Sequence, residues 1–168
     1  GSGWLVEGNE IHLNHGLGLR IGTRMVVRSN FVHSNGELGI GGVGDDVLVE
    51  HNVIARNNRL GFSGAWEAGA TKFVKTRNLI VRHNCVHHNI GPGLWLDIDN
   101  VDALIEHNVV FENDRAGIVN EISGRAEIRD NVVARNGYRK DNWLWNAQIL
   151  VANSRETTVE RNIVVVAR

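Results

Sequence analysis

Residues 105–118 read IEHNVVFENDRAGI, and the same arrangement of residue types recurs along the whole chain. Asn108 has Ile105 three positions before it, Val110 two positions after it, Asn113 five positions after it and Gly117 nine positions after it. Seven asparagines align on this pattern: Asn9, Asn30, Asn52, Asn84, Asn108, Asn131 and Asn162. The regular register predicts that the chain consists of seven copies of one short unit.

The other positions of the unit recur as well. A second asparagine follows the first by five residues in six units: Asn14, Asn35, Asn57, Asn89, Asn113 and Asn136. A glycine and an apolar residue follow in five units: Gly18–Leu19, Gly39–Ile40, Gly61–Phe62, Gly93–Leu94 and Gly117–Ile118. Successive units are 21 to 24 residues apart, except for two intervals of 32 and 31 residues.

A repeat of this length, with short β-branched runs and no helical period, is typical of one coil of a β-solenoid. Equivalent residues of parallel coils stack about 4.8 Å apart, so an inward asparagine can bond to its equivalents above and below. This pairing removes the cost of burying the amides. We therefore expect an all-β, single-domain parallel β-solenoid of about seven coils over residues 1–168, with an internal asparagine ladder.

The residue two positions before the first asparagine alternates in charge along the chain. The seven residues are Glu7, Arg28, Glu50, Arg82, Glu106, Arg129 and Glu160. Outward side chains that alternate in this way pair across neighbouring strands, whereas like charges would repel. We interpret this column as structural.

Composition excludes several classes of protein. The chain has 18 Lys and Arg against 19 Asp and Glu, a net charge of −1, which argues against a nucleic-acid partner. No run approaches the roughly 18 apolar residues of a membrane helix, so no membrane insertion is expected. The single cysteine, Cys85, excludes an intrachain disulfide and a Cys-rich zinc site.

The segments VRHNCVHHNIGPGLWLDIDN (81–100) and IEHNVVFENDRAGIVNEIS (105–123) resemble the right-handed parallel β-helix family, the pectate-lyase-like superfamily. The resemblance covers essentially the whole chain and implies a right-handed coil. It also implies a secreted, extracellular or periplasmic protein, although no basic-led apolar leader opens this sequence. Because the family includes lyases, hydrolases, epimerases and phage tailspikes, the resemblance specifies the fold more than the function.

The two long intervals predict loops near residues 64–73 and 137–145 that leave the solenoid. They contain three of the five tryptophans, Trp66, Trp143 and Trp145, which could wall a groove. Departures from a regular repeat are the places where function is expected.

An acidic cluster is expected between the two loops. Alternation along residues 94–99 predicts that Trp95, Asp97 and Asp99 point outward, and that Leu94, Leu96 and Ile98 point inward. Asp97 and Glu121 both lie 13 residues after a ladder asparagine, so they should be neighbours on one face. Two adjacent carboxylates are destabilising unless one is protonated or a cation bridges them, and either state suits a functional site.

These residues favour a polysaccharide site. Trp95 and Trp66 would stack on sugar rings, with Glu67 beside them, and the carboxylates would perform acid–base catalysis or hold a hard cation. Hydrolysis would use Asp97 and Glu121, with a separation of about 5 Å favouring retention and about 6.5–9.5 Å favouring inversion. Elimination would use Lys72 as the base, with Asp97, Asp99 and Glu121 around Ca²⁺.

Three alternatives remain. The chain could be a non-catalytic glycan-binding or structural β-helix, or a trimeric module like that of a tailspike. The acidic face could also be an ordinary solvated surface neutralised by Lys72 and nearby arginines. No catalytic motif of the family matches residue by residue.

Histidines occupy repeat positions. His51, His83 and His107 precede the first ladder asparagine. His12 and His33 are equivalent residues of adjacent coils and could share a metal, but no carboxylate or cysteine completes a ligand set. We interpret the histidines as surface stacks.

Four residues before the first asparagine, an outward position carries an aliphatic side chain in five units: Leu5, Val26, Leu48, Ile80 and Leu104. An apolar stripe of this kind is expected to be covered, and no amphipathic helix protects the coil ends. The predicted cover is a second copy of the chain or the remainder of a longer one.

Overall fold

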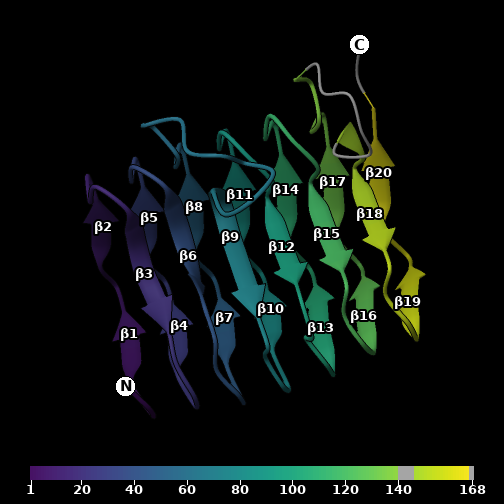
Figure 1. Cartoon of the computed structure of the whole chain (residues 1–168), viewed down its shortest axis with the longest axis horizontal. Helices are drawn as coiled ribbons and strands as arrows, with labels where there is room; N and C mark the ends of the chain where they lie inside the picture. Colours follow the sequence, from purple (N-terminus) through teal and green to yellow (C-terminus); the bar gives the residue numbers. More distant parts are fainter. Residues whose placement is uncertain (140–145, 167–168) are drawn as a thin grey trace.

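The computed structural model describes residues 1–139 and 146–166, in which twenty short strands form three parallel sheets of one solenoid (Figure 1). The first sheet contains β1 (Leu5–Glu7), β4 (Val26–Arg28), β7 (Leu48–Glu50), β10 (Ile80–Arg82), β13 (Ala103–Glu106), β16 (Ala126–Arg129) and β19 (Thr157–Glu160). The second contains β2 (Glu10–His12), β5 (Phe31–His33), β8 (Val53–Ala55), β11 (Cys85–His87), β14 (Val109–Phe111), β17 (Val132–Ala134) and β20 (Ile163–Val165). The third contains β3 (Leu17–Ile21), β6 (Leu38–Gly42), β9 (Gly69–Val74), β12 (Leu94–Asp97), β15 (Ile118–Glu121) and β18 (Ile149–Ala152).

Each of the first six coils contributes one strand to each sheet, and the last described coil contributes β19 and β20 to the first and second sheets (Figure 1). The strands pair in the register that the asparagine alignment predicts, as when Val81 pairs with Val49 and with Ile105. The expected all-β parallel solenoid is therefore confirmed. Over the part of the chain that the structure describes, no helix is long and apolar enough to cross a membrane.

The two predicted asparagine columns form continuous hydrogen-bonded ladders. The Asn108 carboxamide accepts from the backbone N–H and the Nδ2 of Asn84, both at 3.0 Å. Its own Nδ2 donates to Asn131 Oδ1 at 3.0 Å and to the Val81 carbonyl at 2.9 Å. The second column repeats this pattern from Asn14 to Asn136.

Aliphatic columns fill the interior beside the ladders. The following side chains, all at the predicted inward positions, are completely buried: Val27, Val49, Val81, Ile105, Ile128, Val32, Ile54, Val86, Val110 and Val133. These strands of the first and second sheets are only three or four residues long, and their stacked columns form the core together with third-sheet side chains such as Ile40, Leu94 and Ile118.

A left-handed residue precedes every asparagine of the first ladder. The values of φ lie between 51° and 69° in Gly8, Ser29, His51, His83, His107, Asp130 and Arg161. None of the seven is β-branched, and β-branched residues are the ones that this conformation disfavours most. The corner thus turns the chain sharply enough to direct the following carboxamide inward.

Two polar arrangements were not predicted. Gln148 Oε1 accepts from the backbone and side-chain amides of Asn136, both at 3.0 Å, so a glutamine completes the second ladder. A shorter ladder follows the third sheet, where Thr76, Asn100 and Ser123 bond across consecutive coils. This ladder contains three different residue types, so a repeated asparagine does not reveal it in the sequence.

The first insertion was assigned to the wrong residues. The repeat pattern aligns Gly61–Phe62 with Gly39–Ile40, but Ile40 pairs with Thr71, and residues 69–74 form β9. The alignment failed because a loop of residues 58–68 precedes the strand and begins with a chance match to the repeat. In the second expected insertion, residues 140–145, including Trp143 and Trp145, lie outside the described residues.

The charged column pairs between coils as predicted. Arg28 lies 2.7 Å from Glu7, Arg82 lies 2.9 Å from Glu50, and Arg129 lies 2.8 Å from Glu106. The predicted aliphatic stripe is also present on the outer face of the first sheet, where Leu5 is exposed and the other four residues are partly exposed. What covers the stripe stays a prediction.

Replacing Asn108 with Ala should lower the free energy of unfolding by at least about 1–3 kcal/mol, because the buried amides of Asn84 and the Val81 carbonyl lose partners. Urea unfolding measures this change. Asn9→Ala is the matched control, because the exposed Asn9 lies at the ladder end and water can replace its bonds. Equal losses in the two variants would contradict the role of the ladder.

Low pH should destabilise the fold at the stack formed by His51, His83 and His107. His83 stacks between His51 and His107, with ring centroids 4.9 and 5.1 Å apart. Burial, and then the neighbouring imidazoles, lower the pKa of His83. A lowered pKa means that the folded state binds the proton less readily than the unfolded state, so stability should fall as the pH drops below about 6.5. His83→Gln should reduce the loss of melting temperature between pH 7 and pH 5, and an unchanged pH dependence would exclude this effect.

Candidate active site

The candidate site lies on the outer face of the third sheet, where three neighbouring strands bring charged side chains together. Lys72 comes from β9, Asp97 from β12 and Glu121 from β15. They line a pocket of about 190 Å³, whose lining residues are Ala65, Trp66, Lys72, Trp95, Asp97, Ile98, Glu121 and Ile122.

The sheet register explains this convergence. Asp97 pairs directly with Glu121, and Leu96 pairs with Phe73, so Lys72 lies beside Trp95 on the same outward face. The predicted adjacency of Asp97 and Glu121 is thus confirmed, whereas their chemical role stays a prediction. Lys72 belongs to a strand and not, as expected, to the inserted loop.

The 58–68 loop forms one wall of the pocket. Asn58 anchors its start, because the Asn58 side chain donates to the Phe62 and Ile90 carbonyls at 2.9 and 2.7 Å. Near its end, the Ser63 carbonyl accepts the N–H of Trp66 at 3.0 Å. These bonds hold the Trp66 side chain, which is 71% exposed, at the pocket.

Lys72 links the loop to the sheet. Its Nζ lies 2.9 Å from Asp97 Oδ2, donates to the Trp66 carbonyl and lies 4.2 Å from the centroid of the Trp95 ring. Asp97 is only 5% exposed, so this ion pair offsets the cost of burying its carboxylate. An ammonium group held in this way is charged and has no lone pair with which to act as a base.

Trp95 is not the open platform that the sequence predicted. It points out of the solenoid, but it is only 2% exposed, because it packs with Ala116, Val119 and Leu150 and lies under Lys72. The alternation rule gave its direction but could not reveal what covers it. Trp66 is therefore the exposed aromatic ring of this pocket.

The two carboxyl groups differ in environment. Burial raises the pKa of the Glu121 carboxyl, and the neighbouring Asp97 carboxylate raises it further. The Trp95 indole and the Lys72 ammonium oppose this rise. The arrangement therefore combines a carboxyl group that tends to keep its proton with a carboxylate that is paired to a lysine, which is a division suited to acid–base chemistry.

Asp99 does not join the pocket, and the prediction that Ile98 points inward was wrong. Both residues are left-handed, with φ of 52° and 58°, so β12 ends at Asp97 and strict alternation ends with it. Asp99 pairs with Arg77 at 3.2 Å instead. The predicted Ca²⁺ ligands Asp97, Asp99 and Glu121 are thus not assembled, and among the described residues no group of three His, Cys, Asp or Glu residues is arranged to hold a metal.

Glu67 also lies away from the pocket lining. Burial raises the pKa of Glu37, and the nearby Glu67 carboxylate raises it further, so Glu67 lies close to Glu37 and is not among the residues that line the pocket. The prediction failed because it counted residues through the insertion.

The pocket rim contains two residues that sequence analysis missed. Ile98 and Ile122 are 42% and 49% exposed, and φ is 52° in Ile98 and 48° in Ile122. A left-handed β-branched residue is unfavourable, and such strain often accompanies functional sites. The signal in the sequence was an isoleucine directly after each of the two acidic residues.

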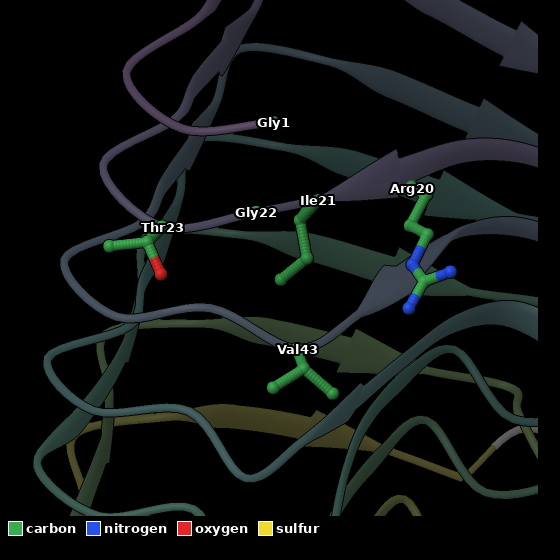
Figure 2. A pocket seen from close by; sticks show the side chains of 6 residues that line it. All are labelled: Gly1, Arg20, Ile21, Gly22, Thr23 and Val43. Atoms are coloured by element: carbon green, nitrogen blue, oxygen red, sulfur yellow. The ribbon is translucent and has the colours of Figure 1, made fainter.

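A second hollow, of about 390 Å³, lies beside β3 and β6 (Figure 2). Its lining residues are Gly1, Arg20, Ile21, Gly22, Thr23 and Val43. Arg20 is the only charged side chain in this lining, so the hollow lacks the paired acid and base of the first pocket.

Comparison with known proteins agrees with this architecture. A family model described as a right handed beta helix region matches residues 1–164. A solved structure described as "The complex structure of XylC with xylose" is similar with a TM-score of 0.79 and 17% identity, over 94% of this chain and 29% of that chain. This chain thus spans less than a third of that protein, and the likeness establishes the fold alone. No curated protein matches the sequence.

The pKa of Glu121 should respond to its neighbour. In the Asp97→Asn variant the pKa of Glu121 should fall, because the neighbouring negative charge is removed and Lys72 no longer pairs with a carboxylate at position 97. A titration of the side-chain carboxyl carbons by NMR measures this shift. A Glu121 pKa that is unchanged in this variant would show that the two carboxyl groups do not interact.

Proposed function

The chain belongs to the right-handed β-helix family, and on this basis we propose that its pocket binds and hydrolyses a neutral polysaccharide. Asp97 and Glu121 are the proposed catalytic pair. The observation that carries the proposal is the contrast between these two neighbours, since Glu121 has a raised pKa and Asp97 is paired with Lys72 at 2.9 Å.

In this mechanism Glu121 is the general acid. Its proton would pass to the glycosidic oxygen as the bond to the sugar breaks, while the Asp97 carboxylate stabilises the positive charge that develops on the ring or bonds to the anomeric carbon. Water would then add its hydroxyl group to that carbon, with release of Asp97 if it had bonded, and return a proton to Glu121. Lys72 is a positioning residue that holds the Asp97 carboxylate in an ion pair.

Sugar binding is supported by the apolar rim. Trp66, Ile98 and Ile122 surround the charged floor and can cover the C–H face of a sugar ring. The similar β-helix structure contains xylose, which supports a sugar as the class of ligand.

A neutral chain fits better than a polyuronate. Lys72, the cation among the residues that line the pocket, already pairs with Asp97 at 2.9 Å and so is not free to bind a uronate carboxylate. The described residues also supply no three-carboxylate set that could hold Ca²⁺ against a uronate. Lys72, which donates to Asp97 and to the Trp66 carbonyl, is poorly suited to abstract a proton in elimination.

Glycan binding without catalysis is the second candidate. It is favoured by the burial of Asp97, which is 5% exposed, because a buried ion pair can be purely structural. In that case Trp66 would still contact the sugar.

Incubation with neutral and acidic polysaccharides tests the proposal through the release of reducing ends. Asp97→Asn and Glu121→Gln should each reduce hydrolysis of the accepted neutral substrate at least about 100-fold, the usual range for a lost acid or base. Activity should also decline as rising pH removes the Glu121 proton. Asp99→Asn is the matched control and should retain activity, because Asp99 lies outside the pocket.

Other outcomes would contradict hydrolysis. Full activity in both pocket variants would exclude the proposed pair, and an ultraviolet-absorbing unsaturated product would indicate elimination. Binding that is lost in Trp66→Ala, without turnover in the unmodified protein, would establish the second candidate.

A further inference from the structure

Two consecutive histidines converge at a corner of the second sheet. His87 is the last residue of β11 and points outward, in the register position of Phe111. His88 follows with φ of 55°, a left-handed conformation that turns its side chain to the same outer surface. His87 Nδ1 and His88 Nδ1 are consequently 2.8 Å apart.

Neighbouring coils hold both rings. His87 stacks on Phe111 with ring centroids 4.9 Å apart, and His88 contacts the same ring edge-on at 5.8 Å. Glu112 Oε2 lies 2.7 Å from His88 Nε2, and Glu112 Oε1 accepts from Arg135 Nε at 2.9 Å. Phe111 and Glu112 therefore hold the two imidazole rings in place without a bound ligand.

We propose that His87 and His88 form a binding site for a divalent transition metal, with Cu²⁺ preferred. The two nitrogens are 2.8 Å apart, so a metal about 2.0–2.1 Å from each of them would have a nitrogen–metal–nitrogen angle of about 85–90°. This is the angle between adjacent ligands in the tetragonal geometry of Cu²⁺, and it is too small for tetrahedral Zn²⁺.

One choice of tautomers leaves a lone pair of His88 at the shared point. If His88 Nε2–H donates to Glu112 Oε2, the lone pair of His88 is on Nδ1, where it can accept from His87 Nδ1–H. For Cu²⁺ to bind Nδ1 of both rings, the His87 proton would move through solvent from Nδ1 to Nε2, so that His87 binds as a neutral imidazole and no net proton is released.

Glu112 would act as a positioning residue behind His88. A carboxylate on the outer nitrogen of a metal-bound imidazole fixes the ring and increases its basicity. Among the described residues no third His, Cys, Asp or Glu completes the set, so water or an added ligand would occupy the other positions.

An earlier coil supplies an internal comparison. At the same corner His33 Nδ1 lies 3.0 Å from Ser34 Oγ, so the fold itself directs a strand-end imidazole toward the next side chain. A hydroxyl is a poor copper ligand. The stacked rings of His51, His83 and His107 are nearly parallel, with interplanar angles of 4° and 8°, and do not direct two nitrogens at one point.

Titration of the purified chain with Cu²⁺ alone, followed by calorimetry and electron paramagnetic resonance, tests the site. We expect one Cu²⁺ bound in an axial spectrum with hyperfine structure from two nitrogens. His87→Ala and His88→Ala should each remove this pattern and weaken binding at least tenfold. Glu112→Gln should weaken binding about tenfold while retaining the pattern.

His33→Ala is the matched control and should leave Cu²⁺ binding unchanged, and circular dichroism confirms that each variant folds. Absence of the two-nitrogen spectrum in the unmodified protein would overturn the proposal. Equal weakening in His33→Ala and His88→Ala would do the same, because binding would then be spread over surface histidines. The site is independent of the pocket on the third sheet, so neither result depends on hydrolysis.

Discussion

The amide ladder inside the solenoid is the constraint on which the rest of the structure depends. Each Asn108-type side chain satisfies a backbone N–H and a side-chain amide of one coil while it donates to the next. Such a bond forms only when equivalent residues are one strand spacing apart, so a slip of one residue would leave several buried amides unpaired. The ladder thereby fixes the register of all three sheets, and this register makes Asp97 a neighbour of Glu121.

The corners decide where chemistry can occur on this frame. A strand residue alternates between core and solvent, whereas a left-handed corner residue breaks the alternation and exposes its side chain beside the last strand residue. The corner after β12 separates Asp99 from Asp97 and exposes Ile98. The corner after β11 brings His88 to His87. Both proposed sites therefore lie where a regular strand passes into a strained turn.

The coil, its register and the adjacency of Asp97 and Glu121 could be predicted because they follow from a residue type repeated at a fixed interval. The burial of Trp95 could not, since it depends on the Lys72 ammonium above its ring and on packing with Ala116, Val119 and Leu150. Glu67 and Phe62 were misplaced because counting through the 58–68 loop loses the register. The convergence of His87 and His88 needs a backbone angle that alternation does not contain. Sequence periodicity thus predicts the coil and its register, whereas the side-chain arrangement in the loops and corners can be seen only in the structure.

We propose that the register set by the amide ladder forms a sugar-hydrolysing pocket between β9, β12 and β15. A crystal structure of the Glu121→Gln variant with a neutral oligosaccharide is the sharpest test of this proposal. We expect a sugar ring against Trp66, with its glycosidic oxygen within hydrogen-bonding distance of the side chain at position 121 and the ring beside Asp97. An oligosaccharide bound elsewhere on the solenoid, with Asp97 still closed under Lys72, would contradict it.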